Sequence, residues 1–513
     1  MNNLLPIPVL LPFFGAGAAL LLGRRPRLQR LVSILVLTAL LGTAVALALI
    51  THAEGIQTLW VGAWPGTAGI VLVADRLSSL MLAVAAIVAL AVLVFSTGQD
   101  EAETRQETPV SVFHPTFLLL CAGVSNAFLA GDLFNLFVGF EILLFASYVL
   151  LTMGGTGTRI RSGSIYVVVN LLSSSLFLIA IAGTYAAAGT VNLAQLARRL
   201  PELPADVQTG LQLLLLTVFG IKAAVFPLSA WLPDAYPTAP APVTAVFAGL
   251  LTKVGVYAII RTQTLLFPQQ PLTELLGVVA LLTMVVGIMG AIAQAELKRM
   301  LSFTLVSHIG YMLMGVSLAT VAGYGAAIFY TAHHIVIQAA LFLVAGLVSR
   351  VGGSTSLDRL SGLVAVSPLL ATLFFVPAMN LAGIPPFSGF LGKVGLIQAG
   401  VVVGTPLAWA LVAGSVVTSL LTLYAMAKAW NRAFWGDPAA LVRPEPDEEP
   451  DEDGDADGGP RLPQVMVGAT VGLIAVSLAM TALAGPLYAF TDGAAATLLS
   501  PAYTDAVLTG GRA

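Results

Sequence analysis

The chain is divided into long apolar stretches, and most of them have the length of a helix that crosses a lipid bilayer. A spanning helix needs about 20 mostly apolar residues. Hydrophobic residues make up 58% of the 513 residues and charged residues only 10%, whereas a soluble domain has roughly 25% charged residues. A chain this apolar would expose too much hydrocarbon surface in water. The sequence therefore predicts an all-α integral membrane protein with about fourteen transmembrane helices.

Three segments do not fit a simple straight span. The stretch 367–403 is too long for one helix and contains Gly383-Ile384-Pro385-Pro386, which predicts a broken helix. The segment 57–74 is interrupted by glycine and proline and is expected to be an extended or hairpin loop on the outside, and 192–204 is expected to be an amphipathic helix at the interface. The predicted spans are 4–23, 31–51, 77–97, 115–131, 132–152, 164–188, 208–232, 240–261, 271–293, 299–320, 325–347, 367–403, 406–430 and 464–487.

The lysine and arginine residues of the short loops predict the orientation. Loops that retain many basic residues stay on the cytoplasmic side. With the N-terminus outside, 15 of the 23 basic residues lie in cytoplasmic loops, 5 lie outside, and 3 lie within spans. With fourteen spans, both termini are then outside.

Six predicted spans each contain an ionisable residue away from the ends, where long side chains can reach water. Each charged residue costs about 2.5–3.5 kcal/mol at the centre of a membrane helix on insertion scales, so such residues indicate function. They are Glu141, Lys222, Lys253, His308, His334 and Lys393, from six different spans. Burial raises the pKa of a carboxyl group and lowers that of a lysine, which suits both groups to passing protons near neutral pH. The set therefore predicts a proton relay, although either histidine could instead be a packing residue.

Prolines interrupt two of these spans beside a lysine. Pro227 follows Lys222, and Pro385 and Pro386 precede Lys393. Broken helices at corresponding positions of two halves indicate inverted repeats with an ion site between them, while ordinary kinks are the alternative. We expect an N-terminal three-helix segment (1–114), two inverted five-helix repeats with broken helices 7 and 12 (115–262 and 263–435), an acidic cytoplasmic loop (436–463), and a last helix with a tail (464–513).

Other motifs are missing from the sequence. It has no Walker A loop, dinucleotide fingerprint, metal-binding Cys/His cluster or haem site, and HHIVIQ at 333–338 is not a zinc-protease motif. We therefore expect no cofactor, no metal site and no nucleic-acid partner, and an ion gradient or other subunits must supply the energy. Residues 445–457 carry nine acidic residues in thirteen. They are expected to form a solvated, disordered loop, and gathering cations near a pore mouth is the alternative.

Four strings resemble the antiporter-like membrane subunits shared by respiratory complex I, membrane-bound hydrogenases and Mrp-type multisubunit Na⁺/H⁺ antiporters. The similarity covers about 65–435. The strings are DLFNLFVGFEI (132–142), GIKAAVFPLSAWLPDAYPTAPAPVTAVFAGLLTKVGVYA (220–258), LKRMLSFTLVSHIGYML (297–313) and LAGIPPFSGFLGKVGLI (381–397). The run beginning YPTAPAPVTAVF, together with GTVNLAQLA, is most similar to the D-type subunits of Mrp antiporters. Ser229, Tyr236 and Gln338 depart from the complex I pattern.

The resemblance implies roles for residues that match the motifs. Glu141 and Lys222 match an essential pair, Lys253 and Lys393 match the lysines of helices eight and twelve, and His334 matches the histidine that links the two half-channels. Fourteen helices, the two repeats and a bacterial plasma (inner) membrane location are implied as well. Asp132 and Asp234, at opposite ends of their spans, are possible residues for proton access or exit.

Three functions remain open from the sequence. The first is a secondary transporter subunit, not an enzyme, that exchanges Na⁺ or another monovalent cation for protons together with other membrane subunits. The second is a proton-pumping subunit of complex I or a membrane-bound hydrogenase, with the same relay and another energy source. The third is a structural membrane scaffold whose charges are vestigial.

Overall fold

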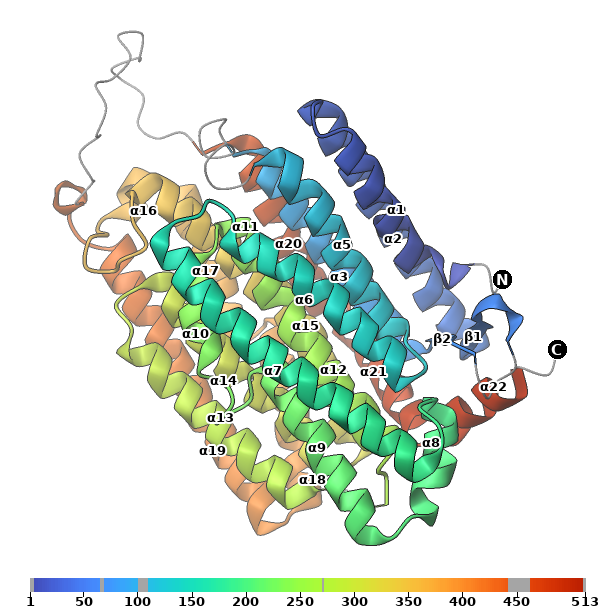
Figure 1. The fold of residues 1–513 in the computed structure, drawn as a ribbon. Helices are drawn as coiled ribbons and strands as arrows, with labels where there is room; N and C mark the ends of the chain where they lie inside the picture. The colour runs from blue at the N-terminus through green and yellow to red at the C-terminus, as the bar shows by residue number, and fades with distance from the viewer. Residues whose placement is uncertain (1–3, 65–68, 100–108, 270–271, 442–461, 511–513) are drawn as a thin grey trace.

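The computed structural model describes residues 4–64, 69–99, 109–269, 272–441 and 462–510, which form a bundle of α-helices (Figure 1). Eleven described helical segments are long and apolar enough to cross a membrane, which confirms a helical, multi-pass membrane fold. The count of fourteen crossings stays a prediction. The acidic run 445–457 lies outside the described residues.

The helices follow the predicted spans in order. The N-terminal half contains α1 (Ile7–Leu21), α2 (Pro26–Glu54), α3 (Arg76–Thr97), α5 (Val110–Leu129), α6 (Leu133–Thr152), α7 (Gly157–Ala188), α8 (Leu193–Arg199), α9 (Ala205–Ala223), α10 (Trp231–Ala235), α11 (Ala241–Val246) and α12 (Thr252–Leu265). The C-terminal half contains α13 (Thr273–Ala293), α14 (Leu297–Ser317), α15 (Val321–Gly352), α16 (Leu363–Val366), α17 (Pro368–Ala382), α18 (Ser388–Val403), α19 (Pro406–Ala429), α20 (Gln464–Ala482), α21 (Ala484–Leu498) and α22 (Ala502–Gly510). Single turns are η2 (Val61–Ala63), η3 (Leu200–Glu202), η4 (Tyr236–Thr238), η7 (Pro438–Ala440) and the π-helical η5 (Phe247–Leu251) and η6 (Trp430–Phe434).

Both predicted helix breaks are present. Helix α9 ends at Ala223, and Ala224 takes a left-handed conformation (φ 57°) before the chain turns into α10. Helix α17 ends at Ala382, and Gly383 takes the same conformation (φ 85°) before α18 begins. A left-handed residue ends a helix because it turns the chain away from the helical path. Each break leaves carbonyl groups at a helix end inside the bundle.

The centre of the bundle is built around α15. Nearly all of its 32 residues are buried, and it packs against α3, α11, α14, α17, α18, α20 and α21. Helices α12 and α14 are also almost fully buried, whereas α1, α2, α7, α13 and α19 expose one apolar face. Helices that are apolar all round belong in a core, and an exposed apolar face suits contact with lipid. The buried polar residues of α12, α14 and α15 therefore lie far from the exposed faces of the bundle.

Two predicted surface elements are present at one end of the bundle. Strands β1 (Gln57–Trp60) and β2 (Val71–Ala74) form an antiparallel hairpin in which Gln57 pairs with Ala74. Helix α8 follows Asn192, whose side chain accepts hydrogen bonds from Ala194 and Gln195 as an N-cap. Both elements contact α22 (Figure 1). Their location on the outside of the membrane stays a prediction.

The C-terminal segment differs from the predicted single span with a tail. Helix α20 ends at Ala482, and α21 begins after Leu483, with Pro486 in its first turn where proline is tolerated. Helix α21 packs on the centre of the bundle because Tyr488 stacks on Phe329, with 4.2 Å between ring centroids, and its hydroxyl donates to the carbonyl of Leu391 at 2.9 Å. The tail is thus largely helical.

Candidate functional site

The six predicted relay residues lie on six different helices that meet in the bundle. Five of the six are at most 4% exposed, and only Glu141 is half-buried. They are Glu141 on α6, Lys222 on α9, Lys253 on α12, His308 on α14, His334 on α15 and Lys393 on α18. Glu141 and Lys222 form one pair, and His308, His334 and Lys393 belong to a larger cluster. Lys253 lies between the pair and the cluster.

A serine bridges Glu141 and Lys222. The hydroxyl of Ser174, on α7, donates to Oε1 of Glu141, and Nζ of Lys222 donates to the same hydroxyl oxygen at 2.9 Å. Lys222 also lies over the ring of Phe140, 5.5 Å from its centroid. A buried ammonium requires such partners because it has lost its water shell. The bridge forms a short hydrogen-bonded connection between carboxylate and ammonium.

Lys222 and Lys393 both lie beside a helix break, but their contacts there differ. Lys222 lies in the last turn of α9, just before the break, where the dipole of a helix C-terminus favours a cation. Lys393 donates to the carbonyls of Leu381 (3.1 Å) and Ala382 (2.9 Å), the last residues of α17 before its break. The break after α17 therefore provides carbonyl acceptors for the Lys393 ammonium, whereas Nζ of Lys222 donates its hydrogen bond to the Ser174 hydroxyl.

Lys253 follows a π-helical turn. Its Nζ donates to the carbonyl of Ala248 at 2.5 Å, within η5. A π-turn disturbs the regular backbone ladder and is frequent at functional sites. A side chain at Gly255 would place its Cβ only 2.7 Å from the backbone nitrogen of Ala223, so α12 and α9 pack backbone to backbone beside Lys253 and Lys222. No hydrogen bond joins the two lysines among the described residues.

The histidines form a cluster with two tyrosines between Lys253 and Lys393. The rings of His308 and His334 lie 5.1 Å apart between centroids, and the Tyr330 hydroxyl lies 2.8 Å from Nδ1 of His308. The Tyr330 ring lies 5.4 Å from the Tyr311 ring, which in turn lies 5.0 Å below Nζ of Lys393. Both ring nitrogens of His334 are buried without a hydrogen-bond partner among the described residues.

His333, the neighbour of His334, contacts the start of α18. Its Nδ1 lies 3.0 Å from the hydroxyl of Ser388, the first residue of α18. The side-chain oxygen of Asn380 accepts a 2.8 Å hydrogen bond from the backbone of Gly389. His333 therefore ties α15 to the break between α17 and α18. The two adjacent histidines have different contacts and are not equivalent.

The two predicted access residues lie at opposite ends of the bundle. Asp234 forms a 2.8 Å ion pair with Arg299, and both side chains are about half exposed. Such exposed pairs contribute little stability. Asp132 is 5% exposed and caps α6 by accepting a 2.6 Å hydrogen bond from the backbone of Asn135, while its Oδ2 has no partner among the described residues. Burial raises the pKa of Asp132 to about 6.

We expect Asp132 to make the stability of the chain depend on pH. A carboxyl group whose pKa is raised on folding favours the folded state at low pH, and this contribution is lost as the pH rises from about 4 to about 6. Asp132→Asn keeps an N-cap residue and removes the titration. The melting temperature of the wild type should fall more between pH 5 and pH 7.5 than that of the variant. Parallel pH profiles would contradict the assignment.

A buried ion pair that the sequence did not reveal lies near the β1–β2 hairpin. Arg261, on α12, donates to both carboxylate oxygens of Asp75 at 2.6 and 2.9 Å, and both side chains are at most 3% exposed. Asp75 also caps α3 through Ser78. Burial raises the pKa of Asp75, but the charge and hydrogen bonds of Arg261 outweigh it, so the pKa lies below its ordinary value. The pair joins α3 to α12.

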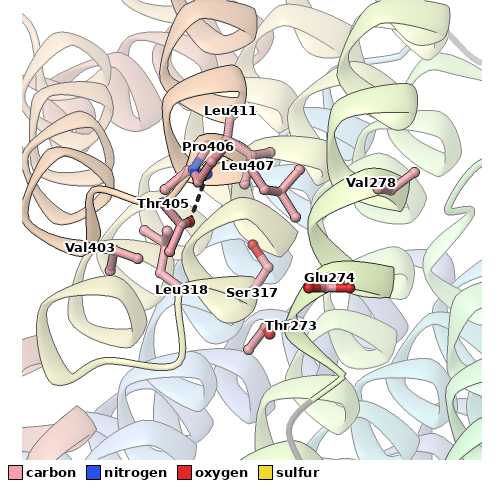
Figure 2. Close-up of a pocket in the computed structure, with 11 residues that line it drawn as sticks. Thr273, Glu274, Val278, Ser317, Leu318, Val403, Thr405, Pro406, Leu407 and Leu411 are labelled. Atoms are coloured by element: carbon pink, nitrogen blue, oxygen red, sulfur yellow. Dashed lines mark hydrogen bonds between the residues drawn. The ribbon is translucent and has the colours of Figure 1, made fainter.

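A surface pocket of about 510 Å³ opens where α13 and α19 begin and α14 and α18 end (Figure 2). Glu274 and Ser317 supply polar groups, and Thr405 accepts a 3.2 Å hydrogen bond from the backbone of Ala408. The pocket is apart from the buried relay residues, but α14 and α18 also carry Tyr311 and Lys393. Ser317 is six residues beyond Tyr311, or about 9 Å along the helix. Glu274 was not predicted from the sequence because it lies at the end of a span, where charges normally meet water.

Comparison with known proteins identifies the family of the chain. Residues 130–422, more than half of the chain, match the family described as NADH:quinone oxidoreductase/Mrp antiporter, transmembrane. The chain belongs to this family. It is 42% identical over 443 residues to the D-type subunit of the Na⁺/H⁺ antiporter of Alkalihalophilus pseudofirmus, covering 85% of this chain and 88% of that protein.

Solved structures share the fold of this chain. A chain of the Mrp complex from Dietzia sp. DQ12-45-1b is 34% identical, with a TM-score of 0.89 and coverage of 99% of this chain and 100% of that one. A chain of respiratory complex I from Thermus thermophilus, 23% identical, has a TM-score of 0.73 and covers 94% and 98%. The resemblance to D-type Mrp subunits seen in the sequence is therefore confirmed. The likeness to complex I is one of fold.

Proposed function

We propose that the chain is a subunit of a multisubunit antiporter that exchanges Na⁺, or another monovalent cation, for protons driven by the proton-motive force. The similarity to D-type subunits of Na⁺/H⁺ antiporters and to a chain of an Mrp complex supports this proposal. The observation that carries it is the hydrogen-bonded bridge from Glu141 through Ser174 to Lys222. A transporter of protons needs titratable groups in contact inside the membrane, and this bridge provides them.

The relay would run from the bridge towards Lys393. A proton that reaches Lys222 places positive charge near Lys253, and like charges repel strongly in a medium of low dielectric constant. The rings of His334 and His308, 5.1 Å apart between centroids, come next in the proposed relay. The tyrosines then connect the histidines to Lys393. Because buried polar groups in native proteins are paired with protein or ordered water, we expect ordered water at the ring nitrogens of His334.

The two ends of the relay remain proposals as well. Asp132 and Asp234 are retained as access or exit residues, and the pocket at Glu274 is a candidate mouth at the ends of α14 and α18. Helices α14 and α18, which carry the Tyr311–Lys393 contact, both end at this pocket. A carboxylate at such a mouth raises the local concentration of cations.

The half-exposed position of Glu141 supports a partner subunit. Phe134 and Phe145 lie on the same face of α6 as Glu141, seven residues before and four residues after it, and both are about half exposed. A carboxylate on an apolar face at this depth would be unstable against lipid. We therefore propose that another membrane subunit covers this face in a hetero-oligomeric complex.

We also retain the predicted organisation and topology as proposals. Each proposed repeat, 115–262 and 263–435, contains one broken helix with a lysine at the break. The excess of basic residues in alternate loops supports a cytoplasmic location for those loops. With fourteen spans, both termini are then outside. The named bacterial relative supports a location in the bacterial plasma membrane.

Ser174→Ala should lower the antiport rate by about tenfold or more. The substitution removes the group that bridges the carboxylate and the ammonium, and a hydrogen bond to a charged group contributes about 1.5–3 kcal/mol. The rate is measured in everted vesicles as cation-dependent dissipation of a pH gradient. Ser175→Ala is the matched control because Ser175 is the next residue on α7 and points to the exposed side. Equal rates for the two variants would remove Ser174 from the relay.

Purification in mild detergent tests the proposed function itself. The proposal expects hydrophobic partner subunits without redox cofactors, and proton movement that requires Na⁺ or another monovalent cation. Iron–sulfur or flavin subunits in the same particle would support a proton pump of the complex I or hydrogenase type instead. Proton movement independent of added cation would contradict antiport.

A further inference from the structure

The turn between α1 and α2 forms a basic pocket of about 460 Å³. We call it the arginine pocket, and it is lined by Arg25, Pro26, Arg27, Leu28, Arg30 and Gln99. Arg25 and Arg27 are exposed, and Arg30 is half-buried with an Nε that has no partner among the described residues. The pocket lies at the opposite end of α2 from the β1–β2 hairpin (Figure 1). It belongs to neither the relay nor the pocket at Glu274.

The backbone holds these arginines on a fixed turn. The nitrogen of Arg25 donates to the carbonyl of Leu22 at 2.7 Å, and the nitrogen of Gln29 donates to the carbonyl of Arg25 at 3.0 Å. The buried side chain of Gln29 donates to the carbonyl of Ala19 at 2.9 Å and so fastens α2 to α1. Helix α2 starts at Pro26 without a side-chain cap. Its first backbone N–H groups therefore add to the positive potential of the arginines.

An exposed apolar surface starts directly beside the arginine pocket. Leu21, the last residue of α1, is 89% exposed. Leu28, Leu31 and Leu35 follow at helical spacing on α2 and are 41–58% exposed. A molecule that fits both surfaces carries a negative group at one end and long hydrocarbon chains at the other. Those are the two parts of an anionic phospholipid.

We propose that the arginine pocket binds the phosphate headgroup of an anionic phospholipid whose acyl chains lie on the leucine face of α1 and α2. Guanidinium groups bind phosphate oxygens through paired N–H donors. Basic pockets at the cytoplasmic end of transmembrane helices bind anionic headgroups in this way. Loop charge alone would explain basic residues near the membrane, but not a pocket bordered by a continuous apolar face. A soluble protein partner with an acidic surface would leave the leucines uncovered.

Native mass spectrometry of the whole detergent-purified complex tests the proposal with phosphatidylglycerol as the probe. The wild type should retain phosphatidylglycerol in preference to phosphatidylcholine. Arg25→Gln with Arg27→Gln should weaken this binding by about 30-fold, because each arginine near an anionic lipid contributes roughly a fivefold factor. The matched control is Arg161→Gln with Arg359→Gln, which removes the same charge from exposed positions outside the pocket. That control should bind the lipid as the wild type does.

Four results would overturn the proposal. The first two are equal retention of phosphatidylglycerol and phosphatidylcholine by the wild type, and equal loss of phosphatidylglycerol binding in both double variants. The third is binding of glycerol phosphate as tight as that of phosphatidylglycerol. The fourth is phosphatidylglycerol binding that appears only after the acidic residues of 445–457 are neutralised. The last result would show that the chain's own acidic segment occupies the pocket. A melting curve of each variant shows whether the complex is still folded.

Discussion

Lys222→Ala is expected to abolish cation-dependent proton movement while the complex still assembles in the membrane. The substitution removes the ammonium that donates to the Ser174 hydroxyl and leaves Glu141 bonded to Ser174 but without its positive counter-charge. A positioned proton-transfer group commonly contributes a factor of about 10² to 10⁴ in rate. Lys222→Arg should also be inactive, since a guanidinium keeps its proton at any physiological pH. The assay is dissipation of a pH gradient in everted vesicles, at matched amounts of complex.

Lys428→Ala is the control for this result. Lys428 lies in the last turn of α19 and donates to the carbonyls of Ile292 and Gln294 at 2.8 Å. It therefore resembles Lys393 in donating to two backbone carbonyls, but it lies outside the proposed relay. Transport should remain within about twofold of the wild type. A Lys222→Ala variant that retained half of the wild-type rate would show that protons do not pass through this lysine.

The second large effect concerns stability and is expected from Asp75→Asn. This substitution leaves the Arg261 guanidinium buried without a counter-charge, although asparagine still caps α3. Breaking one partner of a buried ion pair costs about 3–5 kcal/mol. We therefore expect a large fall in the temperature at which half of the complex is lost from its size-exclusion peak.

Asp505→Asn provides the matched comparison for the buried pair. Asp505 pairs with Arg198 at 3.3 Å, but both side chains are 58% exposed. Exposed pairs are worth at most about 1 kcal/mol, so the melting temperature should change little. If the two variants lost stability equally, the pair between Asp75 and Arg261 would not hold α3 to α12 as described.

The sequence revealed those features that depend on local composition. The breaks after Lys222 and before Lys393 were predictable because a proline removes a backbone donor and tends to end or kink a helix. The hairpin at 57–74 was predictable from its interrupted apolar pattern. A functional role for the buried lysines was predictable because few structural roles place an ammonium group in the middle of a membrane span.

Features that depend on how helices face each other were not predictable. Ser174 is one of three consecutive serines, 173–175, in an apolar span, and a serine there can satisfy itself on its own helix. Only the packing of α6, α7 and α9 shows that Ser174 meets Lys222. Asp75 and Arg261 lie at the ends of spans far apart in sequence, where charges normally meet water. The serine run was the one available signal for the bridge.

A high-resolution cryo-EM map of the assembled complex would test the central claim most directly, which is that the buried titratable groups form one connected route. The measurement is the density around the ring nitrogens of His334, between Lys253 and Lys393. We predict ordered water within hydrogen-bonding distance of at least one of these nitrogens, leading towards each lysine. Dry apolar packing on all sides of the His334 ring would contradict the route.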